Sequence, residues 1–439
     1  MTYQEAQEIL FSLPRFSDAG AAAYQPGLER MHMLLAAMGN PHEIFPSIHV
    51  AGTNGKGSTA SMVAAIGTAF GKRIGLHTSP HLFDFAERMR IDGQPAAHIW
   101  IADATSRFKN DIVRIKPSFF EASVALSFLY FAEEAVDLAV VEVGLGGRFD
   151  ATNVLTPRVC AVTHIGLDHT EQLGDSLEVI AGEKGGIAKP GVPLLSAVED
   201  APSSAVLRAT VQRAHGEFEN VRETTSPEVI NNTTSDLVIN LQTPLRLYND
   251  LNVGLRGVHQ AWNVAVAVRL AETAWPDIQR EAVRTGLAKV VELSGLRGRC
   301  ETISEQPRII VDVAHNADGW QAALAFADPK QDGQLFVLVG VMGDKDVSAL
   351  ATLLVEHNAI ALPASLPSPR AMLKSALSDI IQETGVSVVD VADIKDAIGW
   401  FHRSATERDV LLITGSHIAV AELHDHIYKP QLNPTHLDA

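Results

Sequence analysis

A glycine-rich segment at residues 52–58 constrains the fold of this chain more than any other stretch. It has the sequence Gly-Thr-Asn-Gly-Lys-Gly-Ser and follows a short, mostly apolar run at 48–51 that is typical of a strand. Small and apolar residues at 61–70 predict a buried helix. A strand, a glycine-rich turn and a helix form a phosphate cradle, because glycines let backbone N–H groups approach the anion and the helix N-terminus adds partial positive charge.

Two side chains of this segment carry the expected chemistry. We expect Lys56 to reach the terminal phosphates and the hydroxyl of Ser58 to bind Mg²⁺. The spacing departs from the standard P-loop, since Val50 takes the place of its first glycine and Gly57 separates Lys56 from Ser58. The alternative is a tight strand-to-helix turn with no ligand. Three glycines around one lysine favour the phosphate site.

Length and composition limit the class of protein. A chain of 439 residues suggests two or three domains, and 46% apolar with 20% charged residues indicates a globular protein. The net charge of −17 disfavours nucleic acid and anionic membranes as partners. Cys160 and Cys300 are far apart, which favours reduced thiols over a disulfide. The sequence shows no secretion signal and no membrane-spanning run, so we expect a cytoplasmic protein.

The rest of the N-terminal part predicts more strands and helices around the loop. The continuous apolar run at 136–143 is typical of a parallel strand covered on both faces. Glu142 lies near the end of this run, where open α/β sheets bind their ligands, so it is placed to hold Mg²⁺. A salt bridge to a neighbouring helix is the alternative. Further strands are expected at 73–77 and 159–165, helices at 28–38, 119–134, 177–188 and 202–214, and short antiparallel strands at 231–248.

The C-terminal part alternates strands and helices. Strands are expected at 308–313, 334–341, 359–363, 386–391 and 409–414, which predicts a second, Rossmann-like parallel sheet. It lacks a Gly-x-Gly-x-x-Gly fingerprint, so dinucleotide binding is disfavoured. The fold class is therefore α/β, with a large N-terminal P-loop ATPase domain at 1–294 and a smaller C-terminal Rossmann-like domain at 295–439.

The glycine-rich loop resembles the ATP loop of the Mur ligase superfamily, and more closely that of the folylpolyglutamate synthase / dihydrofolate synthase family. Other blocks resemble the family in the same order along the chain. They are Thr-Ser-Pro-His at 78–81, Gly-Gly-Arg-Phe-Asp-Ala-Thr-Asn at 146–153, Leu-Asp-His-Thr at 167–170, Glu-Lys-Gly-Gly-Ile at 183–187, Gly-Val-His-Gln at 257–260, Gly-Arg-Cys-Glu at 298–301, Asp-Val-Ala-His-Asn at 312–316 and Thr-Gly-Ser at 414–416. Phe149, Ala317 and His417 depart from the residues usual in the family.

The resemblance implies ATP, two Mg²⁺ ions and a modified lysine. The residues it places on ATP are Thr53, Asn54, Gly55, Lys56, Gly57, Ser58, Thr59, Asn263 at the adenine, Arg299 and Asp312. Ser58, Glu142 and His169 are the implied metal ligands, although histidine is an unusual ligand for Mg²⁺. Lys184 matches a lysine that is often carbamylated, which requires a neutral amine made available by burial or nearby cations. A surface lysine on an amphipathic helix is the alternative.

The resemblance also implies a substrate site. Its residues are Ser79, Arg88, Phe120, Asp150, Asp168, His315 and Ser416. Phe120 and Asp150 are candidates for contacts to a pterin, with Asn153 anchoring the loop, and His315 is expected to orient the incoming glutamate. Without the resemblance, Phe120 reads as a core residue and Arg88 as part of a solvated charge cluster. Lys56, Lys184 and His315 are the expected catalytic residues.

The implied activity is ATP-dependent ligation of L-glutamate to dihydropteroate, to the γ-carboxylate of reduced folates, or to both, through an acyl phosphate. We expect a monomer that binds these small molecules and closes its two domains around them. One alternative is a Mur-type cell-wall ligase, which the 146–153 block disfavours. The other is a nucleotide-binding protein without catalysis, which the joint presence of Lys56, Glu142, His169, Lys184 and His315 disfavours.

Overall fold

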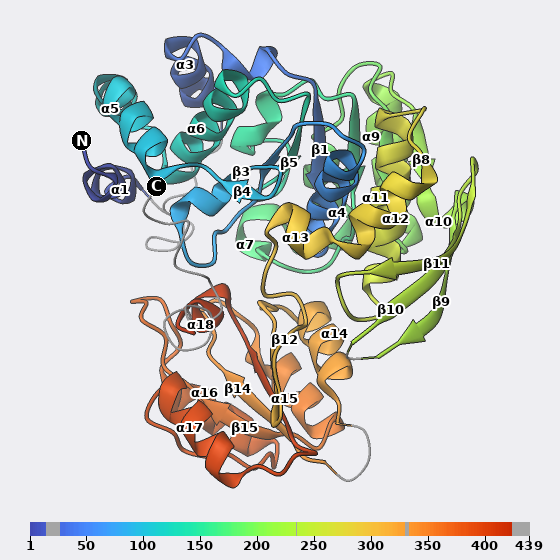
Figure 1. The fold of residues 1–439 in the computed structure, drawn as a ribbon. Coiled ribbons are helices and arrows are strands. Elements are labelled where there is room, and N and C mark those ends of the chain that lie inside the picture. The colour runs from blue at the N-terminus through green and yellow to red at the C-terminus, as the bar shows by residue number, and fades with distance from the viewer. Residues whose placement is uncertain (15–26, 234, 330–332, 424–439) are drawn as a thin grey trace. The chain divides into compact units, whose positions relative to one another are not determined.

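The computed structural model describes residues 1–14, 27–233, 235–329 and 333–423. The chain divides into two compact units (Figure 1). The first comprises Met1–Asn232, Asp236–Gly254 and His259–Leu296, and the second consists mainly of the residues from Arg297 onward. In the described part of the chain, we find no helix with the length and hydropathy needed to cross a membrane.

The first unit is built on an eight-stranded sheet with the order β4-β3-β2-β5-β1-β6-β7-β8. Its strands are β1 (Ser47–Ala51), β2 (Ile74–His77), β3 (Met89–Ile91), β4 (Gln94–Pro95), β5 (Leu138–Glu142), β6 (Val159–Val162), β7 (Leu194–Ser196) and β8 (Phe218–Asn220). Neighbouring strands along the stretch β2-β5-β1-β6-β7-β8 pair parallel, which confirms the predicted parallel sheet. At one edge the sheet continues with two strands that the sequence analysis did not include, since β3 pairs antiparallel with β2 and β4 pairs antiparallel with β3. A short turn at 92–93 joins these two strands, and so short a connection permits only antiparallel pairing.

Helices cover both faces of this sheet (Figure 1). One face carries α4 (Lys56–Ala69), which packs against α11 (Gln260–Ala274), α12 (Arg280–Ala288) and α13 (Val290–Ser294). The other face carries α6 (Phe119–Glu133) with α3 (Glu29–Ala37) and α5 (His98–Ile115), and α8 (Leu177–Gly185) with α9 (Ala201–Arg213). Helix α4 begins at Lys56, earlier than the helix expected at 61–70, and is buried from Gly57 to Gly67. Burial on every side explains why its sequence shows no polar stripe.

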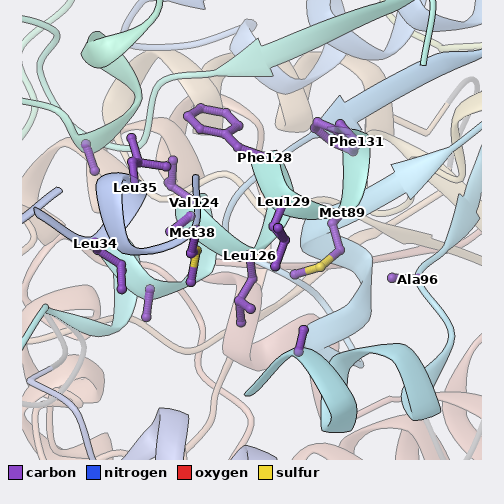
Figure 2. Close-up of a cluster of buried hydrophobic side chains, with 14 of the residues drawn as sticks. Leu34, Leu35, Met38, Met89, Ala96, Val124, Leu126, Phe128, Leu129 and Phe131 are labelled. Atoms are coloured by element: carbon purple, nitrogen blue, oxygen red, sulfur yellow. The ribbon is translucent and has the colours of Figure 1, made fainter. Parts of the chain in front are cut away.

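A large hydrophobic core lies between the sheet and helix α6. Ser118 caps α6 in a capping box with Glu121, which fixes where the helix begins. Phe128 and Phe131 of this helix belong to one buried cluster with Leu34, Leu35 and Met38 from the region of α3 (Figure 2). Ala139 and Val141 of β5 belong to the same cluster, so these alternate residues mark the face of the sheet that α6 covers.

Shorter elements complete the first unit. They are α1 (Tyr3–Phe11), η2 (Pro41–Glu43), η3 (Phe85–Arg88), η4 (Ala151–Val154), α7 (Thr170–Leu173) and α10 (Val221–Thr224). The antiparallel strands expected at 231–248 are confirmed as a three-stranded sheet of β9 (Ser226–Asn232), β10 (Leu237–Gln242) and β11 (Leu247–Val253). Arg269 of α11 bonds Glu219 and Glu272, and Glu272 accepts a hydrogen bond from Tyr248 of β11, so a buried polar network ties this sheet to the unit.

The second unit holds a five-stranded sheet with the order β12-β13-β16-β14-β15. Its strands are β12 (Glu301–Glu305), β13 (Arg308–Val311), β14 (Leu335–Val339), β15 (Ile360–Pro363) and β16 (Val410–Thr414). Its helices are α14 (Ala317–Ala327), α15 (Val347–Glu356), α16 (Lys374–Glu383), α17 (Ile394–Ser404) and α18 (His417–Ala421). Four of the expected strands are confirmed and pair parallel. The remaining strand of this sheet, β12, was not predicted, and it pairs antiparallel with β13.

The prediction of a strand at 386–391 is wrong. Val388 makes an isolated parallel bridge with Ala361 and no longer ladder. Lys374 of α16 bonds the carboxylate of Asp390 and the carbonyl oxygen of Val391, so the end of this segment is held by a helix side chain. Hydropathy alone cannot distinguish such a segment from an edge strand.

Candidate active site

The glycine-rich loop joins β1 to α4 at the carboxyl end of the central strand. Gly55 is the N-cap of α4 with φ 82°, and a Cβ there would lie 2.3 Å from Asn263 Oδ1. Gly52 has φ 151°, and a Cβ there would lie 2.0 Å from Thr163 Oγ1. Both positions therefore require glycine for backbone conformation and for close packing. This places Asn263 of α11 directly beside the loop, inside the helix and away from its cap at His259.

Polar bonds tie the loop to the segment that follows β6. Thr53 donates its backbone N–H to the His164 carbonyl oxygen at 2.7 Å, and its Oγ1 bonds the backbone of Gly166. The hydroxyl of Thr163 donates to the carbonyl oxygen of Asn54 at 2.7 Å. Sequence reasoning missed Thr163 and Gly166, for which no motif gave a signal. Gly57, Ser58 and Thr59 form the buried first turn of α4 behind the loop.

Two lysines meet at the loop. Lys56 Nζ donates to the carbonyl oxygens of Gly52 and Thr53, each at 3.0 Å. Lys184 Nζ of α8 donates to the same Gly52 oxygen at 2.9 Å, and Lys184 is 4% exposed. Burial and then the charge of Lys56 lower the pKa of Lys184 to about 7, although Asp168 and Asp150 oppose the shift. The alternative of a surface lysine on an amphipathic helix is therefore wrong.

The candidate metal ligands follow three adjacent strands. Ser58 follows β1, Glu142 ends β5 and His169 follows β6, and β1 lies between β5 and β6. Parallel strands bring such positions to one edge of a sheet. Their hydroxyl, carboxylate and imidazole groups fit a divalent cation, with the carboxylate as the ligand that Mg²⁺ prefers. Among the described residues, no group of three His, Cys, Asp or Glu side chains is close enough to hold a metal.

Glu142 also organises the loop after β2. Its Oε2 accepts a hydrogen bond at 3.0 Å from the backbone N–H of Ser79, and the Ser79–Pro80 peptide bond is cis. The charge of Glu142 acts on Arg88, whose pKa burial lowers to about 10. Arg88 is 6% exposed, donates from Nε to His81 Nδ1 at 2.7 Å and lies 4.9 Å from the Phe119 ring centroid. Reading Arg88 as part of a solvated cluster is therefore wrong.

Asp168 and His169 form a tight pair after β6. His169 has φ 51°, in the left-handed region, and is the N-cap residue of α7. Its backbone N–H donates to Asp168 Oδ1 at 2.9 Å, and its Nε2 lies 3.9 Å from Asp168 Oδ2. Asp168 is therefore placed to orient His169, and its charge also reaches Lys184.

The loop at 144–150 brings Phe120 and Asp150 together. A Cβ at Gly144 would lie 2.4 Å from Phe120 Cζ, so the ring rests against this loop. Asp150 is 4% exposed and accepts bonds from the backbone of Leu145 at 2.8 Å and of Thr152 at 3.0 Å. Burial raises the pKa of Asp150 and these hydrogen bonds oppose the rise. Its carboxylate therefore holds its own loop together.

Asn153 fits the anchoring role that was expected of it. Its Nδ2 donates to the carbonyl oxygens of Arg148 at 2.9 Å and Gly186 at 3.1 Å. These bonds fix the end of the 144–150 loop against the residues that follow α8. Lys189 adds a bond from Nζ to the Asn153 carbonyl oxygen at 2.6 Å.

The remaining predicted residues belong to the second unit. Asp312 follows β13 and accepts bonds from the backbone N–H groups of Cys300 at 2.7 Å and Ala314 at 2.8 Å. His315 Nδ1 lies 3.0 Å from the Val313 carbonyl oxygen. Ser416 caps α18 after β16 by accepting from Ala419 N at 3.1 Å.

The loops after β13 and β16 are joined in this unit. Gly415 N donates to the Ala314 carbonyl oxygen at 3.0 Å, which links the segments that carry His315 and Ser416. Arg299 lies before β12 and donates to the Gly298 carbonyl oxygen at 3.1 Å. Cys160 and Cys300 are both free and buried.

Comparisons with known proteins give the family. Residues 50–271 match the Mur ligase middle domain, and residues 298–417 match the Mur ligase glutamate ligase domain. The dihydrofolate synthase/folylpolyglutamate synthase of Bacillus subtilis (strain 168) is 31% identical over 97% of this chain and 99% of its own.

Two solved structures are similar over nearly the whole chain. The structure of Escherichia coli FolC in complex with DHPP and ADP has a TM-score of 0.88 at 25% identity, covering 98% of this chain and 99% of that one. The Yersinia pestis bifunctional folylpolyglutamate synthase/dihydrofolate synthase complexed with AMPPNP and Mn ion has a TM-score of 0.85 at 27% identity, covering 98% of each. This chain belongs to the folylpolyglutamate synthase/dihydrofolate synthase family of Mur ligases.

Proposed function

We propose that this protein uses ATP to join L-glutamate to the carboxylate of dihydropteroate and to the γ-carboxylate of reduced folates. The observation that carries the proposal is the meeting of Lys56 and buried Lys184 at the Gly52 carbonyl oxygen of a nucleotide-type loop. A cell-wall ligase is disfavoured by full-length similarity to folate enzymes. The presence of both lysines at the loop disfavours a protein without catalysis.

The reaction begins with phosphate transfer. The backbone and side chains of residues 53–59 bind the ATP phosphates, and Lys56 Nζ exchanges its carbonyl partners for phosphate oxygens. The γ-phosphate passes to the acceptor carboxylate and forms an acyl phosphate, with ADP as the leaving group. The glutamate amine then attacks the acyl carbon, phosphate leaves, and the amine loses a proton. Positioning and charge neutralisation supply most of the rate enhancement.

Ser58, Glu142 and His169 would hold Mg²⁺ at the ends of their three strands. When bound, the metal neutralises charge on the transferring phosphate. Two metal sites are proposed, and Lys184 would support the second after carbamylation. A lysine with a pKa of about 7 is about half neutral at pH 7, so its amine is available to CO₂. A carbamate signal from isotope-labelled bicarbonate, lost in Lys184→Met, would test this step.

The other residues are proposed as binding groups. Asn263 contacts adenine, as the family resemblance implies, and its side chain lies against Gly55 of the nucleotide loop. Ser79, Arg88, Phe120, Asp150 and Asp168 form the acceptor side of the first unit. In the second unit, the nucleotide residues are Arg299 and Asp312 and the glutamate residues are His315 and Ser416. The ATPase domain at 1–294, the ligase domain at 295–439, a monomeric state and a cytoplasmic location remain predictions.

The test is phosphate release with ATP, Mg²⁺ and glutamate, comparing dihydropteroate with tetrahydrofolate. We expect turnover with both acceptors and none in Lys56→Ala, whose fold is checked by circular dichroism. Turnover with one acceptor would assign that half of the activity alone. If protein that binds ATP released no phosphate with either acceptor, the proposal would be refuted.

A further inference from the structure

A buried histidine of the central strand takes no part in the site described above. His49 lies on β1 opposite Val141 of β5, and so on the face of the sheet that α6 covers. It is 0% exposed, and its Nε2 lies 2.7 Å from Thr152 Oγ1. It stands three residues before Gly52, on the strand that leads to the phosphate loop. A polar ring in such a place requires a hydrogen-bond partner.

The direction of the hydrogen bonds follows from the number of protons. Thr152 Oγ1 donates its single proton to Asp150 Oδ1, so it can only accept from His49. His49 therefore carries its proton on Nε2. In the described structure its Nδ1, the nitrogen without a proton in this tautomer, is buried without a hydrogen-bond partner. Burial lowers the pKa of His49 to about 3, so the ring is neutral.

The hydrogen bonds from His49 to Thr152 and from Thr152 to Asp150 end at the loop at 144–150. The Asp150 carboxylate joins the start of that loop to η4 by accepting from the backbone N–H groups of Leu145 and Thr152. Burial opposes its negative charge, so each donor to it matters. Phe120 rests on the same loop at Gly144.

We propose that His49 is a positioning residue for the acceptor site, acting through Thr152 and Asp150 on the loop at 144–150. The donor on His49 Nε2 fixes the Thr152 hydroxyl toward Asp150, and Asp150 fixes the loop against which Phe120 packs. The inference rests on the proposed function, because it assigns this loop to binding of the pterin part of the acceptor. ATP binds at a different loop, so its binding is not expected to depend on His49.

Two amide variants at the same position test the proposal. A glutamine amide reaches the place of the imidazole Nε2, whereas an asparagine amide reaches only that of Nδ1. We expect His49→Asn to raise KM for dihydropteroate about tenfold, with KM for ATP nearly unchanged, because one hydrogen bond in a charged network is lost. His49→Gln should lie within about threefold of the parent enzyme. Equal effects of the two variants, or an equal rise in KM for ATP, would overturn the proposal.

A variant at Thr152 tests the same hydrogen bonds if His49→Asn does not fold. Thr152→Val removes the hydroxyl and leaves His49 in place, so it should raise the same KM. In the double variant with His49→Asn the two effects should not add, since both break one chain of bonds. Additive effects would refute a shared route.

A spectroscopic measurement separates this inference from the proposed function. Isotope-labelled imidazole resonances, assigned with His49→Gln, should show His49 protonated on Nε2, with that proton shifted by Thr152→Val. Protonation on Nδ1 would refute the hydrogen-bond chain even in an active enzyme. If the parent enzyme turns over no pterin acceptor, the proposed function fails, and with it the assignment of this loop to the pterin, whatever the spectrum shows.

Discussion

Replacing Lys184 by methionine should change how stability depends on pH. The pKa of Lys184 falls from its ordinary 10.5 to about 7, chiefly because the side chain is buried. Above pH 7 the folded protein releases this proton while the unfolded chain keeps it up to about pH 10.5. The unfolded state then binds more protons, so the stability of the parent protein rises with pH relative to Lys184→Met.

The size of the effect follows from the two pKa values. A fall of 10.5 − 7, about 3.5, corresponds to at most about 5 kcal/mol against the protonated form. Between pH 6 and pH 9, the linkage relation predicts that the parent protein gains about half of this free energy, roughly 2–3 kcal/mol, relative to Lys184→Met. Below pH 6 the two proteins should keep a constant difference, because both states of Lys184 are then protonated. The methionine side chain fills a similar volume and has no charge, so it isolates the ionisation.

The assay is urea unfolding of both proteins from pH 5 to pH 9 in CO₂-free buffer. Exclusion of CO₂ keeps Lys184 unmodified, and a parallel series with bicarbonate measures the effect of carbamylation. A stability difference that stays constant across this range would refute the reasoning, since it would mean that Lys184 ionises as it does in water. If the parent protein instead lost stability relative to Lys184→Met as the pH rises, the sign would be wrong and the reasoning would also be refuted.

Two further variants test packing and charge. Gly55→Ala should weaken ATP binding at least tenfold in calorimetry, because it combines a left-handed φ with a clash, whereas Gly71→Ala, with φ 79° and nothing within 4 Å, should leave ATP binding unchanged. Equal ATP affinity in the two variants would contradict this. Arg269→Met should cost about 3–5 kcal/mol in urea unfolding, because Glu219 and the buried Glu272 lose their cation. A loss below about 1 kcal/mol would show that the pairs behave like exposed ones.

The central part of the fold was predictable because its strands carry their own signal. β1, β5 and β6 are buried on both faces, so each appears as an apolar run before a turn. Edge strands carry no such signal. β12 has partly exposed residues along most of its length, and its sequence reads as a loop. The start of α4 was placed too late because Gly57 is typical of a turn, and only its packing makes it helical.

Burial of charged site residues was not predictable from residue type. Lys184 and Arg88 read as solvated groups without the family resemblance, since lysine and arginine rarely lie inside a protein. The structure buries both and gives each a partner, namely the Gly52 carbonyl oxygen, 132 residues from Lys184, and the His81 ring, in the loop seven residues before Arg88. The first is a long-range contact and the second depends on how the loop folds back, so helical or strand periodicity contains no information about either. The role of His49 was missed for the same reason.

The paired lysines are themselves an argument for an anion at the loop. The chain has a net charge of −17, yet Lys56 and Lys184 point at one carbonyl oxygen where their charges repel. Part of that repulsion is relieved by lowering the pKa of Lys184. An ATP phosphate beside Lys56, or a carbamate formed on Lys184, would relieve the rest, because each places a negative charge next to a lysine. The arrangement is unfavourable without a ligand and favourable with one, which is what a site built for phosphate transfer requires.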